Sequence, residues 1–175
     1  PCTLCAPLGA VVATLGLRNG MPLLHGAQGC ATYIRRYLIS HFRDPADVAS
    51  SALKEAETVF GGETNLGRAL DNLVRQYSPE VVTVFTTCLA ETIGEDVPLI
   101  VRRYREQRGA ALPVVCASTP SYRDGHVEGF HAMTHAIVGE LATEAGSQLH
   151  AVNVLPPLLS PADLRHLREL VTAFG

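Results

Sequence analysis

Cys88 is the residue of this sequence that is best placed for chemistry. It follows residues 81–85, an apolar run that is short, nearly continuous and rich in β-branched side chains, as in a strand buried on both faces. A side chain just beyond the carboxyl end of a parallel strand lies where open α/β sheets bind ligands. If a helix begins near Leu89, its free N–H groups and its dipole also stabilise a thiolate at Cys88. The position therefore predicts a metal ligand or a nucleophile.

Two other cysteines share this setting. Cys5 and Cys30 each precede a predicted helix, and Cys30 also follows a predicted strand. We expect these thiolates and that of Cys88 to converge on one rim of a sheet, where Ser121, after a further strand, offers an oxygen ligand. Three scattered thiolates and one oxygen do not complete the tetrahedral thiolate site of structural zinc, and they suit an iron–sulfur cluster better. Nearby glycines let the backbone approach a bulky group: Gly9, Gly26, Gly29 and Gly94.

A zinc site is the first alternative. Cys2 and Cys5 form a C-x-x-C pair, which is half of a common zinc pattern, and His131 and His135 offer a second half. The two halves lie much further apart in the sequence than the halves of a zinc finger, which argues against this interpretation. Histidines on one helix face are also more often surface or packed residues than ligands.

A cysteine nucleophile is the second alternative. Cys88 and His126 would form a Cys/His pair that Glu91 or Asp96 orients, but no local sequence signature supports such a pair. Free cysteines also serve as small buried apolar residues. Cys116, inside a predicted apolar strand, fits that role.

The elements that must position these residues alternate between strands and helices. We expect strands at 21–24, 81–85, 112–117 and 150–155, and helices at 8–17, from 31 to before Pro45, at 64–77 with Thr64 as N-cap, at 97–107, at 127–141 and from 161 onward. Residues 46–62 have no clear periodicity, although 57–60 resemble the end of a strand. The alternation predicts an α/β fold with a doubly wound, Rossmann-like parallel sheet.

The predicted elements suggest two domains. Residues 1–147 would form an N-terminal α/β domain that carries the cysteines. Residues 148–175 would provide the first strand and helix of a second, truncated domain, whose helix begins with Ser160 as N-cap and Pro161 at the first helical position. The chain begins with Pro1 and not Met, which suggests a fragment.

Composition excludes several classes of partner. The 175 residues are 47% hydrophobic and 18% charged, with a net charge of −3, so nothing favours nucleic acid or an anionic membrane. No apolar run approaches the ~20 residues of a membrane span, and no leader for export is visible. We therefore expect a cytoplasmic location. Five cysteines without an export signal indicate metal or redox chemistry more than disulfides.

Several short motifs, in this order and spacing, resemble one family. They are CAPLGA at 5–10, HGAQGC at 25–30, VFGG at 59–62, TTCLAETIGED at 86–96, TPSY at 119–122 and GHVEGF at 125–130. Together they resemble the β-type subunit of nitrogenase component 1 across roughly residues 5–155. Each motif alone is weak, and their combination is specific.

The resemblance implies a fold, a cofactor and partners. In that family the β-type subunit has three similar α/β domains, and this chain corresponds to the first and the edge of the second. A P-type iron–sulfur cluster, 8Fe–7S, lies at the interface with an α-type subunit in a heterotetramer. Cys5, Cys30 and Cys88 match its cysteine ligands from the β side, and Ser121 matches a serine that ligates the cluster in one oxidation state.

The resemblance also implies how such a subunit works. An ATP-dependent iron protein supplies electrons, which pass through the cluster to a catalytic cofactor in the α-type subunit. This chain has no counterpart of that cofactor site, so we expect no catalytic residue here and no activity of the fragment alone. Cofactor-assembly scaffolds of the same architecture, which hold a smaller 4Fe–4S cluster, are the alternative within the family. Cys2 lies outside the matching motif.

Overall fold

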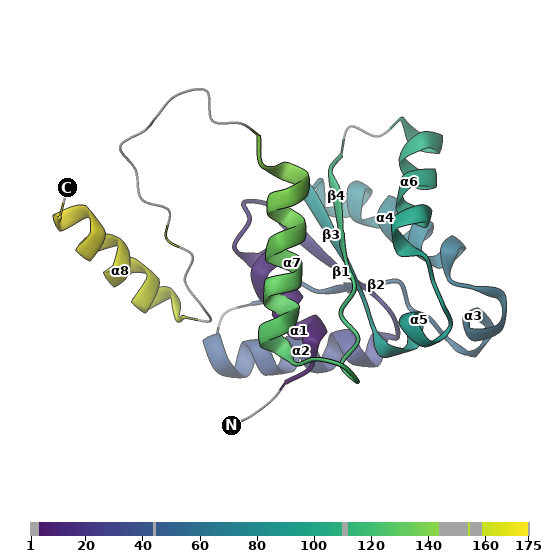
Figure 1. Cartoon of the computed structure of the whole chain (residues 1–175), viewed down its shortest axis with the longest axis horizontal. Helices are drawn as coiled ribbons and strands as arrows, with labels where there is room; N and C mark the ends of the chain where they lie inside the picture. Colours follow the sequence, from purple (N-terminus) through teal and green to yellow (C-terminus); the bar gives the residue numbers. More distant parts are fainter. Residues whose placement is uncertain (1–3, 44, 110–111, 144–153, 155–158, 175) are drawn as a thin grey trace.

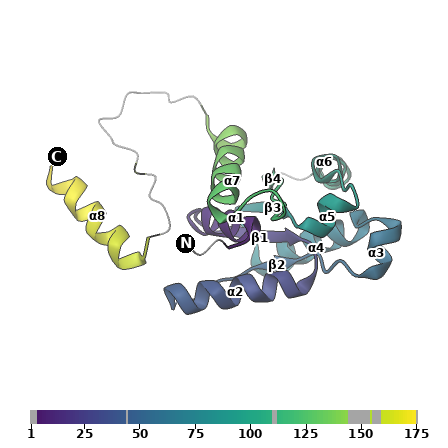
Figure 2. The same ribbon diagram turned by 60° about the horizontal axis from the view of Figure 1, so that its bottom comes forward.

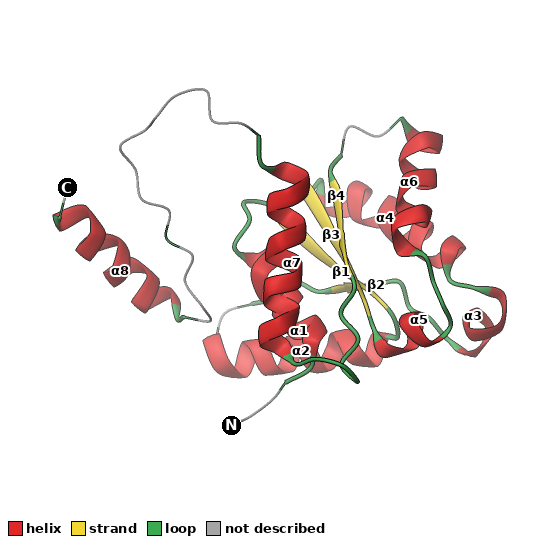
Figure 3. Ribbon diagram, in the orientation of Figure 1, coloured by secondary structure: helices red, strands yellow, loops and turns green. Residues whose placement is uncertain are grey.

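A parallel four-stranded sheet is the centre of the molecule. The computed structural model describes residues 4–43, 45–109, 112–143, 154 and 159–174. The strands are β1 (Gly20–His25), β2 (Ala49–Ser50), β3 (Val81–Thr86) and β4 (Val114–Ala117), in the spatial order β2-β1-β3-β4. All three pairings are parallel, and every residue of β3 is buried. Figure 3 shows the strands side by side between helices.

Helices cover both faces of the sheet. α1 (Ala6–Leu15), α2 (Gln28–Phe42) and α7 (His126–Leu141) contribute side chains to one hydrophobic cluster. α4 (Glu63–Tyr77) and α6 (Val97–Arg108) contribute to the cluster on the opposite face. Figures 1 and 2 show these two helical layers with the sheet between them. The predicted α/β class with a doubly wound parallel sheet is therefore confirmed.

The strand order places the ends of β1 and β3 at a topological switch point. β1 lies between β2 and β3, so the chain leaves these two central strands toward opposite sides of the sheet. Crevices that bind ligands open at such points, beyond the carboxyl ends of the strands. His25 and Thr86, the last residues of β1 and β3, are register partners. The loops toward Cys30 and Cys88 therefore start next to each other.

α1 is fixed along β3 by a buried pair of hydroxyl groups. The Oγ1 atoms of Thr14 and Thr83 lie 2.6 Å apart, and the Thr14 hydroxyl lies 2.9 Å from the carbonyl oxygen of Ala10. Both threonine side chains are fully buried. Because only a short loop joins α1 to β1, α1 runs back along the sheet. Its N-terminus, with Cys5, consequently lies at the carboxyl ends of the strands.

Some predicted boundaries are wrong. Residues 57–60 belong to α3 (Glu55–Phe60), a short helix whose start is capped by the Glu57 carboxylate, which accepts the backbone N–H of Lys54 at 2.7 Å. α4 begins at Glu63 with Gly62 as N-cap, so Thr64 lies inside its first turn. The start of α3 depends on a local hydrogen bond that hydrophobic periodicity does not reveal, and the ends of helices assigned from sequence commonly differ by about one or two residues from those observed.

The last described helix is α8 (Pro161–Ala173). Ser160 is its N-cap and accepts the backbone N–H of Asp163 at 3.2 Å, and Pro161 is its first residue, as predicted. The strand predicted at 150–155 lies outside the described residues except for Val154, which is not in a strand. The division into domains at 147 and 148 stays a prediction. None of the described helices has the length and apolar character that crossing a membrane requires.

Candidate functional site

Cys5 is held by the start of α7. It is the N-cap of α1, and an isolated antiparallel bridge pairs it with Gly125. The carbonyl oxygen of Leu4 accepts the backbone N–H of His126 at 2.9 Å, and Nδ1 of His126 accepts the N–H of Leu4 at 3.2 Å. The segment before α1 is thus fixed on both sides of its backbone. The Cys5 side chain itself stays exposed.

Cys30 lies in the first turn of α2. The helix begins at Gln28, three residues before the predicted start at Ala31. The buried stripe of Ala31, Ile34 and Leu38 anchors α2 to the sheet. Cys30 lies outside that stripe and is exposed. The packing of α2 therefore presents this thiol at the rim of the sheet.

Cys88 is the first residue of α5 (Cys88–Thr92), as its sequence context predicted. Thr87 caps this helix, with Oγ1 accepting the N–H of Ala90 at 3.4 Å. The N–H and the hydroxyl of Thr87 also donate to the carbonyl oxygen of His25, at 3.2 and 3.1 Å. The loop with Cys88 is therefore bound directly to the end of β1, from which the chain continues to Cys30.

Ser121 joins the segments of Cys88 and Cys5. Its backbone N–H donates to Sγ of Cys88 at 3.2 Å, and its hydroxyl oxygen accepts the N–H of Ala6 at 3.2 Å. Ser121 also interacts with the Cys5 thiol, where its hydrogen bond favours the thiolate. The structure thus brings the expected serine into direct contact with one cysteine and next to another.

The three thiols lie within electrostatic reach of one another. Desolvation raises the pKa of the Cys5 thiol, and Cys88 raises it further, although Cys5 as a whole is exposed. Desolvation likewise raises the pKa of Cys30, with additional contributions from Cys5 and Cys88. Each negative charge therefore makes the next deprotonation harder. These contributions place the three thiols near one another, and their role as ligands of one group stays a prediction.

A carboxylate joins the Cys88 helix to the loop of Ser121. Oε1 of Glu91 accepts the hydroxyl of Ser118 at 2.6 Å and also that of Thr86. The N–H of Thr119 donates to Oγ1 of Thr86 at 2.9 Å, and the Thr119 hydroxyl donates to the Thr86 carbonyl at 2.7 Å. The sequence suggested Glu91 only as a partner of a Cys/His pair. Its observed role is to fix α5 against the loop after β4.

The alternatives receive little support from the geometry. Nδ1 of His126 is occupied by the N–H of Leu4, and no hydrogen bond joins His126 to Cys88 among the described residues. His131 and His135 are exposed on α7, and Cys2 lies outside the described residues. Within the described part of the chain, no three His, Cys, Asp or Glu side chains are close enough to bind one metal ion.

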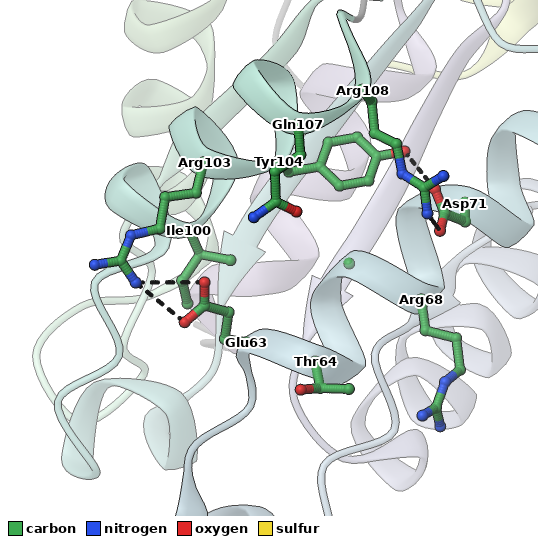
Figure 4. Close-up of a pocket in the computed structure, with 10 residues that line it drawn as sticks. Glu63, Thr64, Arg68, Asp71, Ile100, Arg103, Tyr104, Gln107 and Arg108 are labelled. Atoms are coloured by element: carbon green, nitrogen blue, oxygen red, sulfur yellow. Dashed lines mark hydrogen bonds and ion pairs between the residues drawn. The ribbon is translucent and has the colours of Figure 1, made fainter.

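A groove between α4 and α6 is a separate feature of the surface. Figure 4 shows Arg103 facing Glu63, and Arg108 and Tyr104 facing Asp71. The carboxylates of the groove are thus paired with its own arginines. Desolvation, assisted by Asp71, raises the pKa of Tyr104 to about 12. These arginines form a solvated, charge-paired face, as the sequence suggested, and the groove contains no cysteine.

Thiol reactivity should distinguish the rim cysteines from Cys116. Burial raises the pKa of Cys116 to about 12, from an ordinary value of 9.0. Only the thiolate form of a cysteine is the nucleophile. A pKa of about 12 in place of 9.0 lowers the thiolate fraction of Cys116 at pH 8 by about a thousandfold. A thiolate of higher pKa is also more nucleophilic, which offsets this loss only in part. In the metal-free protein we expect iodoacetamide to modify Cys116 at least about tenfold more slowly than Cys5 or Cys30. Peptide mass spectrometry measures these rates, and equal labelling would contradict the assignment of Cys116 to the core.

The fold and the rim together define a class: an α/β domain of Rossmann-like type that gathers cysteines at its switch point. The chain belongs to the nitrogenase component 1 type oxidoreductase family, because the sequence model of that family matches residues 5–175.

The similar proteins are subunits or assembly proteins of this family. The chain is 38% identical to the nitrogenase molybdenum-iron protein beta chain of Clostridium pasteurianum over 99% of its length, which is 38% of that protein. It is 36% identical to the nitrogenase iron-molybdenum cofactor biosynthesis protein NifN of a Nostoc species, over 96% of this chain and 38% of that one. It thus spans about two fifths of the length of these relatives.

A solved structure agrees with the sequence comparison. "Nitrogenase Cp1 at pH 6.5" matches with a TM-score of 0.92 and 38% identity, covering 99% of this chain and 38% of that chain. A chain of "Nitrogenase Cp1 at pH 5" matches with a TM-score of 0.66 at 21% identity, over 83% of this chain and 31% of that one. The second likeness shows the fold alone.

Proposed function

We propose that this chain is part of a β-type subunit of a nitrogenase-like oxidoreductase and that its rim holds half of an interfacial P-type cluster, 8Fe–7S. Cys5, Cys30 and Cys88 would be the ligands from this side, and the Ser121 hydroxyl would be an additional oxygen ligand. The observation that carries the proposal is the contact of Ser121 with both the Cys88 sulfur and the start of α1, at 3.2 Å each.

The chemistry of the donor set fits a large cationic group. Neighbouring thiols oppose one another's deprotonation at Cys5 and Cys30, and bound iron would compensate this accumulated negative charge. The three thiols are carried by three different segments, at the starts of α1, α2 and α5, so each could bind a different part of a larger group. Because Cys5 and Cys30 are exposed, the remaining ligands can approach from another chain.

When bound, the cluster supplies reversible one-electron transfer. The residues of this chain hold and tune it. The N–H of Ser121 donates to Sγ of Cys88, and hydrogen bonds of this type to ligand sulfurs set the reduction potential of iron–sulfur clusters. Glu91 keeps the loop of Ser121 fixed against α5 through Ser118 and Thr86.

The proposal also names partners and a location. An α-type subunit would cover the rim and provide the other half of the ligands and the catalytic cofactor, in a heterotetramer. An ATP-dependent iron protein would deliver the electrons. The net charge of −3 gives no reason to expect nucleic acid. We propose that the complex is cytoplasmic, that the chain divides into domains between residues 147 and 148, and that the chain alone has no activity.

A scaffold for cofactor assembly is the second candidate. The 36% identity to NifN, close to the 38% identity to the beta chain, favours it. In a scaffold the same rim would hold a smaller 4Fe–4S cluster. The presence of three rim cysteines together with Ser121 favours the electron-relay subunit.

Iron content of the complex tests these proposals. The β-type subunit that contains this chain is purified anaerobically with its α-type partner, prepared without the catalytic cofactor. We expect about eight irons per αβ pair for the relay subunit and about four for a scaffold, with the corresponding visible and paramagnetic resonance spectra. The isolated chain should contain no complete cluster, because its three thiolates leave most irons without protein ligands. An iron-replete monomer with a complete cluster spectrum would contradict the shared site.

A further inference from the structure

A buried polar network lies below the rim, on the sheet face that α4 and α6 cover. His25 is fully buried at the end of β1. Its Nδ1 lies 2.9 Å from Oγ of Ser51, and its Nε2 lies 3.5 Å from Oε2 of Glu95. The other carboxylate oxygen of Glu95 accepts the N–H of Gly62 at 2.5 Å. Oγ of Ser51 accepts the N–H of Gly26 at 3.1 Å.

The network connects loops that are distant in sequence. Ser51 follows β2, Gly62 begins α4, and Glu95 lies between α5 and α6. His25 also holds the Cys88 loop through its backbone, because its carbonyl oxygen accepts both hydrogen bonds from Thr87. From His25 the chain continues into the loop toward Cys30. One residue therefore contacts both cysteine loops and two supporting loops.

The position of Glu95 favours one tautomer of His25. Nε2 lies 3.5 Å from the Glu95 carboxylate and has no hydrogen-bond partner among the described residues, so a hydrogen on Nε2 would be directed at that carboxylate. Nδ1 would then accept the hydroxyl hydrogen of Ser51, whose oxygen also accepts the N–H of Gly26. Burial lowers the pKa of His25, whereas Glu95 opposes this shift. A neutral imidazole between a hydroxyl and a carboxylate is consistent with all these contacts.

Stability alone is a poor reason for this network. Met21 and Leu23, on the same face of β1, belong to the hydrophobic cluster. An apolar residue at position 25 would continue that face. It would also avoid the cost of removing water from an imidazole and from the carboxylate of Glu95, whose side chain is 7% exposed. Buried polar groups are costly unless fully paired, and apolar replacements are often tolerated. The polar residues instead fix which loops lie next to one another.

We propose that His25 and Glu95 are positioning residues that hold the loops of Cys30 and Cys88 at the spacing the interfacial cluster requires. This inference rests on the proposed function. Gly62 lets the backbone before α4 approach the His25 side chain closely. A Cβ atom at this position would lie 2.9 Å from Cε1 of His25 and 2.6 Å from Cδ2 of Leu53. The start of α4 thus packs directly against the imidazole and restricts its movement.

Graded substitutions in the αβ complex test the positioning role. His25→Leu removes both side-chain contacts, His25→Gln retains a polar group near Nε2, and Glu95→Gln retains an acceptor for Gly62. Loss of a residue that supports metal ligands costs roughly 10- to 100-fold in metal retention. We expect His25→Leu to release iron to a ferrous chelator at least about tenfold faster and to change the paramagnetic resonance spectrum. The two glutamine variants should have intermediate effects.

Matched controls separate positioning from general damage. His131→Gln repeats the change of His25→Gln at an exposed position on α7, and Glu80→Gln repeats the change of Glu95→Gln at an exposed position before β3. Both controls should leave iron release and the spectrum unchanged. If His25→Leu does not fold, Glu95→Gln, which has nearly the same shape as the native residue, still decides the question. Wild-type iron release and spectrum in the variants that fold would overturn the proposal.

A second readout keeps the test independent of the cluster. If the wild-type complex binds no iron, the proposed function fails. The spacing of the loops is then measured by the relative alkylation rates of Cys30 and Cys88 in the cluster-free protein. We expect the His25 and Glu95 variants to change this ratio at least about twofold, as loops lose their hydrogen bonds, and the controls to leave it constant. An unchanged ratio would overturn the positioning role.

Discussion

Cys88→Ala, in the β-type subunit assembled with its partner, is expected to lose or remodel the shared cluster and to stop electron delivery. Cys88 begins α5, and its sulfur accepts the N–H of Ser121. In the proposed site, alanine would remove one of the cysteine ligands and leave the irons that Cys88 would hold without a protein ligand. We expect the iron of the shared cluster to fall by at least about half and the cluster spectrum to change. Metal analysis and paramagnetic resonance measure both quantities.

Two other cysteines provide controls for this substitution. Cys116→Ala, in β4, and Cys2→Ala, outside the matching motifs, should retain the iron and the spectrum. A zinc site would instead release metal on substitution of Cys2, His131 or His135. A cysteine nucleophile would lose turnover in Cys88→Ala while the metal content stayed constant. Full iron content and an unaltered spectrum in Cys88→Ala would refute the relay proposal.

The fold class, and the placement of Cys88 and Ser121 at one rim of the sheet, could be predicted from the sequence because both depend on local patterns. The apolar run at 81–85 predicted β3, which is buried throughout. A general rule then placed Cys88 and Ser121 beyond the carboxyl ends of parallel strands, and the contact of Ser121 with the Cys88 sulfur agrees with that expectation. Local signals were sufficient because each cysteine lies close in sequence to the element that carries it.

The order of the strands and the short helix α3 were not accessible in the same way. Buried parallel strands have similar apolar sequences, so nothing local distinguishes the neighbours of β1 from those of β4. The pairing of His25 with Thr86 joins residues far apart in the chain. α3 has only 6 residues and none of them is buried, so it has no apolar periodicity to detect.

Two features of the site needed the tertiary structure. Gly9 suggested room for a bulky group near the cysteines, but a Cβ atom at this position would lie 1.8 Å from the carbonyl oxygen of His126 in α7. The glycine serves the close approach of two helices. The network of His25, Ser51 and Glu95 combines the end of β1, the segment after β2 and the loop between α5 and α6. Neither contact leaves a signal in the residues next to it in sequence.

Gly129→Ala is expected to destabilise the protein by about 2 kcal/mol, because the backbones of α1 and α7 touch at this residue. A Cβ atom on Gly129 would lie 1.9 Å from the carbonyl oxygen of Ala6, far inside van der Waals contact. The helices would have to separate, which disturbs the packing of Leu8, Val11 and Met133 between them and the sheet. Such overpacking costs about 1–3 kcal/mol or more, and the better helix propensity of alanine offsets at most about 1 kcal/mol.

Gly139→Ala is the matched control for this prediction. It makes the same change near the end of the same helix, where an added Cβ would meet no atom within 4 Å. Alanine should therefore stabilise the protein there, by up to about 1 kcal/mol. Urea unfolding followed by circular dichroism measures both free energies. Since α7 also holds the backbone of Leu4 next to Cys5, Gly129→Ala should in addition raise the alkylation rate of Cys5, whereas Gly139→Ala should not. Equal stabilities of the two variants would mean that α1 and α7 do not pack at these glycines.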